Sequence, residues 1–304
     1  VAAGEAPGER LYGMPELRAL GFPVYHSDQR FEGQWAWLVR WLRRWCVNAI
    51  DPATMAEILR SDVLVVKDDF SLVATIFCRL VGRRLVYLDS TFGVPKRGVK
   101  RWSARRSIEL SDVVFTYSTS EVRDWTQNLG VRQDRFAVVR YGMDVEFYRR
   151  GAREGPPAEP SYILAFGRDV GRDYRSLVVA MEGLGCDLKI VTLPYLLEGV
   201  DVARPWIEVR QRVSYAELFS LYAGARAVVV PLKSDISYPS GLRAMLEGML
   251  LERPVIVTRT RILEEYASDA EVQFVRPGDV SDLRNAIGGV VSADWSSLSP
   301  KLER

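Results

Sequence analysis

Short apolar segments alternate with segments of helical periodicity along most of this chain, and the alternation limits the fold more than any other feature. Strands that alternate with helices pair in parallel and have both faces of their sheet covered. We therefore predict an α/β protein with two Rossmann-like domains, each built on a doubly wound parallel sheet. The expected strands fall at residues 62–66, 84–88, 112–116 and 136–139, then at 162–166, 187–191, 207–210, 227–231 and 254–258.

One stretch interrupts this alternation near the middle of the chain. Residues 151–160 are rich in glycine and proline and poor in apolar side chains, which is typical of a linker. We expect an N-terminal domain at residues 1–150 and a C-terminal domain at residues 161–304. Ligands of such sheets bind beyond the carboxyl ends of the strands. Two domains of this kind would therefore hold a ligand in a cleft between them.

The segment after the expected strand at 227–231 carries a candidate binding site. Ser240 and Gly241 precede apolar residues at helical spacing, so we predict that Ser240 is the N-cap of a helix. The N-terminus of a helix offers unpaired N–H groups and positive partial charge, and a diphosphate fits both. Glu247 lies close to two turns later on the same face, where its carboxylate could meet a ribose. An ordinary capped helix with one solvated glutamate is the alternative.

The composition excludes several kinds of site. The chain has 304 residues, of which 48% are hydrophobic and 26% charged, and this describes a soluble globular protein. No apolar run is long enough to span a membrane and no signal peptide is recognisable, so we expect a cytoplasmic protein. His26 is the single histidine, which excludes a histidine-based metal cluster. The three cysteines lie scattered in apolar segments, as expected for buried thiols in a reducing compartment.

Two segments of the first half could contact an anionic partner. Residues 35–46 combine tryptophan with arginine at helical spacing, which suits either a core helix with exposed arginines or a helix at a membrane surface. Residues 96–106 hold six cations and no acid. A solvated helix face is the simplest explanation; a phosphate-bearing acceptor or an acidic leaflet is the alternative. Nucleic-acid binding is disfavoured, because the net charge is only +2 and the cations cluster in one segment.

Four sequence elements of the second half occur in an order that resembles a known family. The first is Gly167-Arg168 with Arg172, and the second is the segment 213–218, which leads into a helix. The third is the loop that begins at Pro231, with Ser240-Gly241 and Glu247 after it, and the fourth is the segment 253–257. With residues 138–148, they resemble the GT-B glycosyltransferases, and specifically the retaining group known as family 4. The resemblance covers most of residues 60–290 and is poor before residue 60.

The resemblance implies a retaining, metal-independent glycosyltransferase of the hexosyltransferase type. It would move a sugar from a nucleotide-diphosphate donor to a glycan, glycolipid or lipid-linked acceptor, with no cofactor besides this co-substrate. Arg168 and Arg172 would neutralise the diphosphate leaving group, and Glu247 would hold the ribose, with no general base assigned. The donor-binding residues implied by the resemblance are Gly167, Arg168, Arg172, Val213, Ser240, Gly241, Leu242 and Glu247.

The sequence departs from the family pattern at two places. Pro239 occupies the position of an earlier glutamate that the family often has, and no histidine follows the expected strand at 62–66. Candidates for the acceptor side, at the ends of first-domain strands, are His26, Asp68, Asp89 and Ser90. These departures leave a non-catalytic nucleotide-sugar binding protein as an alternative. A sugar-nucleotide epimerase of the same architecture is a further alternative. Its reaction requires several histidines and carboxylates, so the single histidine of this chain argues against it.

Overall fold

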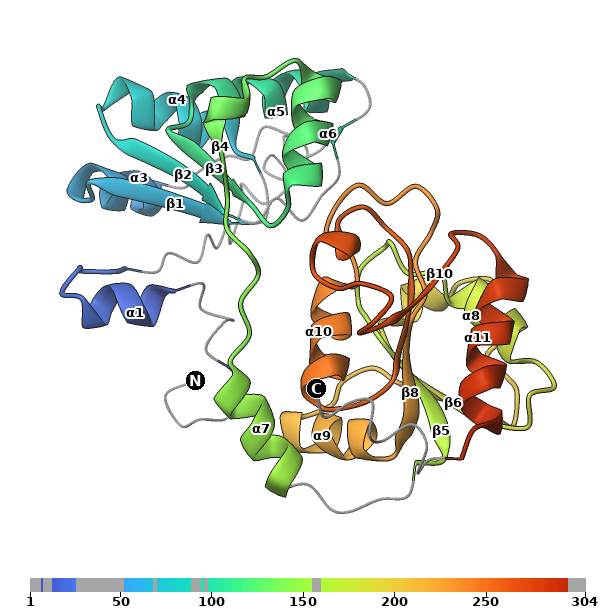
Figure 1. Cartoon of the computed structure of the whole chain (residues 1–304). Coiled ribbons are helices and arrows are strands. Elements are labelled where there is room, and N and C mark those ends of the chain that lie inside the picture. The colour runs from blue at the N-terminus through green and yellow to red at the C-terminus, as the bar shows by residue number, and fades with distance from the viewer. Residues whose placement is uncertain are drawn as a thin grey trace. The chain divides into compact units, whose positions relative to one another are not determined.

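The computed structural model describes residues 7, 13–25, 52–67, 70–88, 94–95, 98–154 and 160–294. The chain divides into two compact units, the first of residues 17–141 with 237–239 and the second of residues 1–16, 142–236 and 240–304. The main passage from the first to the second lies between Tyr141 and Gly142 (Figure 1). Each unit has its own parallel sheet, of four strands in the first and six in the second. The predicted α/β fold with two parallel sheets is therefore confirmed.

The first unit is built on the sheet β1-β2-β3-β4, in which all described pairs are parallel. Leu85 and Tyr87 of the second strand are buried in one core with Ile108 and Trp125 from the covering helices. The described elements up to the boundary are α1 (Met14–Ala19), α3 (Pro52–Arg60), β1 (Val63–Lys67), α4 (Leu72–Leu80), β2 (Arg84–Leu88), α5 (Gly98–Leu110), β3 (Val113–Thr116), α6 (Thr119–Leu129), η2 (Gln133–Arg135) and β4 (Phe136–Val138).

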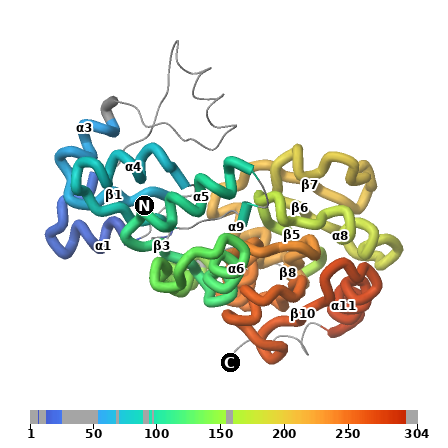
Figure 2. The backbone as a smooth tube through the Cα atoms, turned by 90° about the horizontal axis from the view of Figure 1, so that it is seen from above, coloured from blue at the N-terminus to red at the C-terminus, as the bar shows by residue number. Residues whose placement is uncertain are grey.

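The second unit contains a larger sheet with the strand order β10-β9-β8-β5-β6-β7. Its elements are α7 (Val145–Glu154), β5 (Tyr162–Phe166), α8 (Tyr174–Met181), β6 (Asp187–Val191), η3 (Pro194–Leu197), β7 (Ile207–Arg210), α9 (Tyr215–Ala223), β8 (Ala225–Val230), α10 (Leu242–Leu250), β9 (Val255–Thr258), η4 (Leu263–Glu265), β10 (Gln273–Val275) and α11 (Val280–Ser292). The tube in Figure 2 shows how the chain winds through these strands.

The order of strands in the second sheet reverses between β5 and β8. The chain adds β6 and β7 on one side of β5, then returns to pair β8 with its other side and adds β9 and β10 outward. Such a reversal leaves the connections after the two central strands pointing in opposite directions, which opens a crevice at their carboxyl ends. The segments that follow Phe166 and Val230 meet at this point. Ligands of such sheets bind at the point of reversal, so we expect the ligand site of this unit there.

Helices cover both faces of the second sheet. Figure 1 shows α9 and α10 on one side and α8 and α11 on the other. On the latter side Leu177 and Ile287 pack with Ile163 and Ile190 of the sheet, all fully buried. On the other side Gly248 lets α10 approach closely, because a Cβ there would lie 2.7 Å from Val255 Cγ2. The buried strands are rich in valine and isoleucine, as expected for a sheet with two covered faces.

The chain enters the second unit earlier than the predicted boundary at residue 150. Helix α7 continues to Glu154, within the stretch that we interpreted as a linker, and it belongs to the second unit. Gly151 is the physical reason: a Cβ at this position would lie 2.0 Å from Phe219 Cε2 of α9. The glycine that suggested a flexible linker instead allows two helices to pack closely.

None of the helices among the described residues is both long and apolar enough to cross a membrane.

Candidate functional site

The candidate site lies where the strand order reverses and begins at the turn that follows β5. The N–H group of Gly167 donates to the carbonyl oxygen of Val191 at 3.1 Å. Its own carbonyl accepts from Thr192 Oγ1 and from the hydroxyl group of Tyr174, each at 2.7 Å. A Cβ at Gly167 would lie 2.1 Å from Nε of Arg172. Glycine at this position therefore allows the Arg172 guanidinium to lie against the end of the strand.

Arg172 is a buried cation at the edge of this crevice. The residue is 6% exposed, and its Nε donates to Oδ2 of Asp169 at 2.9 Å. Among the described residues, its buried Nη1 has no hydrogen-bond partner. Buried N–H groups almost always have an acceptor, and guanidinium groups bind carboxylates and phosphates through two parallel bonds. An anion is therefore the ligand that this side chain is best suited to receive.

The backbone around Arg172 is fixed to the segment that follows β8. Arg172 forms an isolated antiparallel bridge with Leu232. The N–H group of Lys233 donates to the Gly171 carbonyl at 2.9 Å, and the N–H group of Asp173 donates to the Pro231 carbonyl at 3.0 Å. Backbone contacts thus join the two loops that meet where the strand order reverses, and they hold the arginine in place before any ligand arrives.

Asp169 links this turn to the start of α10. Its Oδ1 accepts from the Gly171 N–H group at 3.1 Å and from the hydroxyl group of Ser240, while Oδ2 accepts from Arg172. Burial raises the pKa of this carboxyl group, but the Arg172 charge and these hydrogen bonds lower it more, so the pKa lies below its ordinary value. Asp169 is thus a carboxylate at neutral pH. It was absent from the predicted site, because its importance depends on a partner 71 residues away.

The N-terminus of α10 corrects the predicted role of Ser240. The N-cap is Gly241, with a φ of 80°, and a glycine has no side chain with which to cap the helix. A Cβ at Gly241 would lie 2.6 Å from Val230 Cγ1, so both the backbone conformation and the space require glycine. Ser240 instead directs its hydroxyl group to Asp169. Because no side chain among the described residues takes the first N–H groups of the helix, this end keeps the character of an anion site.

Glu247 lies in a different environment from the one that we predicted. Its side chain is 0% exposed. Its Oε1 accepts from the hydroxyl group of Tyr148 and from Nε of Arg243, both at 2.8 Å, and Oε2 accepts from the hydroxyl group of Tyr222 at 3.0 Å. Helices α7, α9 and α10 therefore surround this carboxylate. In this arrangement Glu247 stabilises the packing of three helices and offers no exposed oxygen to a ribose.

Arg243 extends this buried network to a further tyrosine. Its Nη2 donates to the hydroxyl groups of Tyr148 and Tyr215, at 3.1 and 2.8 Å. Burial lowers the pKa of the guanidinium, but Glu247 more than compensates, so its pKa is raised. Burial, and then the charge of Glu247, raise the pKa values of Tyr148 and Tyr222. Both phenols therefore remain protonated and can donate to the carboxylate. The spacing of Arg243 and Glu247, one helical turn apart, was the only sign of this network in the sequence.

The remaining predicted donor residues differ in how close they come to the crevice. Leu242 is the buried first residue of α10, next to the Gly241 cap. Arg168 follows Gly167 in the same turn and has an exposed side chain. Val213 is half-buried and lies in the connection from β7 to α9, just before Ser214, the N-cap of that helix. Asp169 therefore links the turn that holds Gly167 and Arg172 to Ser240, which is followed directly by Gly241 and Leu242 at the start of α10.

The predicted acceptor side lies outside the described residues. This holds for His26, Asp68, Asp89 and Ser90, and also for the tryptophan-rich segment 35–46. Of the basic segment 96–106, residues 98–106 are described and belong to α5. In the part of the chain that the structure describes, no group of three or more His, Cys, Asp or Glu side chains is placed to hold a metal ion.

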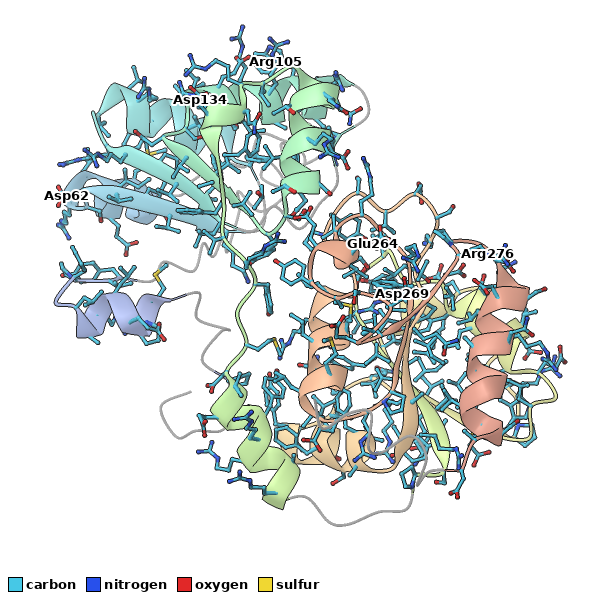
Figure 3. All side chains as sticks on the ribbon, viewed as in Figure 1. Asp62, Arg105, Asp134, Glu264, Asp269 and Arg276 are labelled. Carbon is cyan, nitrogen blue, oxygen red and sulfur yellow. The ribbon has the colours of Figure 1, made fainter. Side chains whose placement is uncertain are left out.

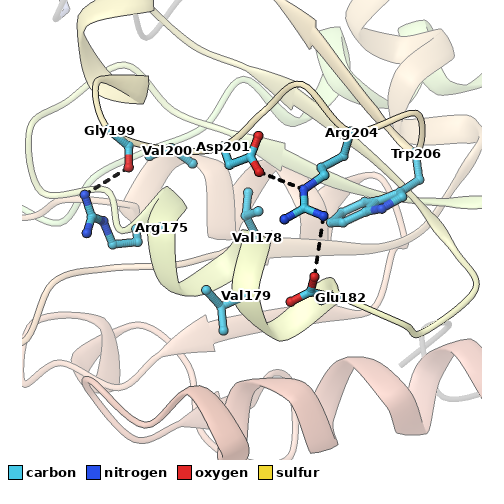
Figure 4. A pocket seen from close by; sticks show the side chains of 9 residues that line it. All are labelled: Arg175, Val178, Val179, Glu182, Gly199, Val200, Asp201, Arg204 and Trp206. Carbon is cyan, nitrogen blue, oxygen red and sulfur yellow. Dashed lines mark hydrogen bonds and ion pairs between the residues drawn. The ribbon is translucent and has the colours of Figure 1, made fainter.

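A cavity of about 250 Å³ lies elsewhere in the second unit, between α8 and the loop that contains η3 (Figure 4). Val178, Val179 and Trp206 give it an apolar wall. The guanidinium of Arg204 at its edge is paired with Asp201 at 2.9 Å and with Glu182 at 3.6 Å. Because the charges at its rim are already paired and no predicted site residue lines it, this cavity is not the candidate site.

Comparison with known proteins identifies the fold. No protein-family model and no curated protein matches this chain. Among solved structures, an α,α-trehalose-phosphate synthase (UDP-forming) from Burkholderia vietnamiensis superimposes with a TM-score of 0.67 and 11% identity, covering 97% of this chain and 87% of that one. HepE from Anabaena, in complex with UDP and glucose, gives a TM-score of 0.65 and 15% identity over 95% and 81% of the two chains.

This chain is also similar to the solved structure of an enzyme that is named as an epimerase and not as a synthase or transferase. The UDP-GlcNAc 2-epimerase from Methanocaldococcus jannaschii gives a TM-score of 0.50 and 14% identity over 93% of this chain and 84% of that one. At such identities the likeness establishes the fold alone. The chain has the GT-B architecture of two units, each with a parallel sheet covered by helices.

Proposed function

We propose that this protein transfers a glycosyl group from a nucleoside-diphosphate sugar to an acceptor. The observation that carries the proposal is the buried Arg172 guanidinium, whose Nη1 has no partner among the described residues. It lies where the strand order reverses, and Asp169 and Ser240 connect its turn to the start of α10, whose N-cap is a glycine. A fixed cation beside a free helix N-terminus suits a diphosphate.

The chemistry follows from where charge develops in the reaction. As the bond between the anomeric carbon and the phosphate oxygen breaks, the leaving diphosphate gains negative charge. Arg172 and the first N–H groups of α10 would stabilise this charge without having to move, and the exposed Arg168 could approach the same phosphates from the solvent side. These groups supply the electrostatic stabilisation that a metal ion gives in other enzymes, so we propose that transfer needs no metal. The group transferred would be a hexosyl group.

We propose that transfer occurs with retention of configuration. The acceptor oxygen would form its bond to the anomeric carbon on the face that the phosphate leaves, and the acceptor proton would pass to the departing phosphate oxygen. No enzyme base is then required. Glu247 has no part in this scheme, because its carboxylate is buried and bonded to Tyr148, Tyr222 and Arg243.

Uridine nucleotides are the donors to test first. HepE was solved with UDP and glucose, and the trehalose-phosphate synthase is described as UDP-forming. A sugar-nucleotide epimerase, which the sequence favours less than a non-catalytic nucleotide-sugar binding protein, is tested here because an epimerase also has this architecture. The two reactions give different products: a transferase releases the nucleoside diphosphate into solution, whereas an epimerase inverts one centre of the sugar.

We propose an anionic or membrane-associated acceptor, with the protein at the inner face of the cytoplasmic membrane. The support comes from α5 and the adjacent α4 of the first unit. Trp102 of α5 is 53% exposed and Leu80 of α4 is 80% exposed, while Lys100, Arg105 and Arg106 are also exposed. Figure 3 shows Arg105 projecting outward from α5. Exposed apolar side chains among cations are suited to a surface of acidic lipids.

Thermal unfolding in the presence of nucleotide sugars tests the proposed donor. A ligand that binds only the folded state raises the melting temperature in proportion to the logarithm of its concentration over its dissociation constant. UDP-, GDP- and dTDP-glucose should be compared at equal concentrations, with the sugar alone as the control. We expect the UDP-sugar to give the largest increase, followed by release of UDP when acceptors are added. If none of the three changes the melting temperature, the proposal is wrong.

A further inference from the structure

Asp169 is an acid inside a site that is otherwise suited to anions. It accepts hydrogen bonds from the Gly171 N–H group, the Ser240 hydroxyl group and Nε of Arg172. A phosphate bound between Arg172 and the start of α10 would need the same kinds of donor: a backbone amide, a hydroxyl group and a guanidinium. The carboxylate therefore engages the groups that the proposed ligand would use.

The two members of this ion pair differ in how firmly they are held. The side chain of Arg172 is 4% exposed, and it is fixed by its contact with Gly167 and by the backbone bridge to Leu232. The side chain of Asp169 is 35% exposed, on a turn between β5 and α8. A partly exposed carboxylate can rotate into water at modest cost, whereas the buried guanidinium cannot leave. The carboxylate is thus the movable partner.

We infer that Asp169 is an internal counterion that occupies the anion site in the free protein and must swing out when the donor diphosphate binds. The inference rests on the proposed function, since it concerns the same site. When the carboxylate leaves, Nε of Arg172 and the hydroxyl group of Ser240 become available to the phosphates. In exchange, the bound state has a carboxylate near a diphosphate, and this repulsion favours release of the nucleoside diphosphate after transfer.

An opposite role would follow if Asp169 only held Arg172 in position. A carboxylate that orients a guanidinium strengthens the binding of a ligand, and its removal would weaken that binding. The counterion role makes the reverse prediction, because removing the charge weakens the bonds that hold the two donors and eliminates a repulsion. The sign of the change in affinity therefore separates the two roles.

Asp169→Asn tests the inference with a nearly unchanged shape and no charge. Affinities for UDP and for inorganic pyrophosphate should be measured by calorimetry at fixed salt concentration. We expect the variant to bind both about tenfold more tightly than the wild type, the order of effect for one partly screened charge near the ligand. Asp169→Ser, a smaller neutral residue, should give an increase in the same direction and serves if the asparagine variant does not fold.

Asp201→Asn is the matched control. Asp201 pairs with Arg204 three residues later at 2.9 Å, the spacing and distance of the pair formed by Asp169 and Arg172, but it lines the separate cavity of Figure 4. Its removal should leave both affinities unchanged. An equal gain in this control would show a general charge effect and overturn the inference.

The remaining outcomes distinguish the inference from the function on which it rests. If the wild type binds UDP, Arg172→Ala weakens binding, and Asp169→Asn also weakens it, Asp169 is a positioning residue and only the inference fails. If neither the wild type nor the Asp169 variants bind UDP or pyrophosphate, both the inference and the proposed donor site are wrong.

Discussion

The hydroxyl group of Tyr148 donates a hydrogen bond of 2.8 Å to Oε1 of Glu247, which joins α7 to α10 across 99 residues of sequence. Tyr222 and Arg243 complete the environment of this carboxylate. A charge buried among helices is tolerated when several donors surround it. This network attaches the first helix after the unit boundary to the second unit, so its removal should affect stability before it affects ligand binding.

Tyr148→Phe should therefore destabilise the protein. The variant keeps the ring and removes one donor from a fully buried carboxylate, at a cost of about 1–3 kcal/mol in the free energy of unfolding. Urea unfolding would measure the change. Tyr195→Phe, at a residue that is 51% exposed, is the control and should change this free energy by less than about 0.5 kcal/mol. Equal effects in the two variants would show that the buried bond contributes nothing.

The tyrosines of this network also predict how stability depends on pH. The pKa values of Tyr148 and Tyr222 are raised above the ordinary value of 10.0. A group whose pKa is raised by folding stabilises the folded state below its unfolded pKa, and this contribution is lost as the pH rises through the folded pKa. Stability should therefore fall above about pH 10, by up to about 1.4 kcal/mol per pH unit for each such tyrosine.

Urea unfolding of the wild type and of Tyr222→Phe at pH 9, 10 and 11 measures this dependence. The variant should be less stable than the wild type at pH 9, and its stability should fall less steeply above pH 10, because one titrating phenol is gone. Parallel curves for the two proteins would contradict the assigned pKa direction of Tyr222.

The packing of α7 on α9 gives a further prediction. Gly151→Ala places a methyl group 2.0 Å from the Phe219 ring, so we expect a loss of about 1–3 kcal/mol from overpacking. Gly289→Ala in α11 is the control, because no atom lies within 4 Å of its added Cβ and alanine favours a helix. The control should be neutral or slightly stabilising. If Gly151→Ala is as stable as the control, α7 is not packed as described.

Much of the fold could be predicted from the sequence because its signals are local. Apolar runs such as that at 162–166 indicate strands by themselves, and the prediction agrees with β5. Gly167 and Arg172 were found through a short motif in a single turn. Asp169 with Ser240 and Tyr148 with Glu247 were not found as pairs, because these contacts join segments 71 and 99 residues apart. Gly151 was misinterpreted for the same reason, since its partner Phe219 lies in another helix.

The exposed cations of α5 predict binding to acidic membranes. Lys100, Arg105 and Arg106 should together contribute less than the sum of about 3 kcal/mol expected at about 1 kcal/mol for each cation near an anionic leaflet, because both arginines pair with Glu109. Changing all three to Glu should abolish co-sedimentation with vesicles that contain acidic lipids at low salt. Arg132→Glu, on an exposed residue of the same unit, should leave co-sedimentation nearly unchanged. A wild type that does not sediment with acidic vesicles at low salt would contradict the membrane proposal.

The most direct test of the donor site is the affinity of the wild type and of Arg172→Ala for UDP, measured by calorimetry. Arg175→Ala serves as the control, because this exposed arginine of the next helix donates to the Gly199 carbonyl and lies in the other cavity. Removing the buried guanidinium eliminates a charge-assisted contact of about 1.5–3 kcal/mol, so the dissociation constant should rise about 10- to 100-fold. The control should bind as the wild type does. Equal affinities of Arg172→Ala and the wild type, or no binding by either, would contradict the assignment of a nucleoside diphosphate to this site.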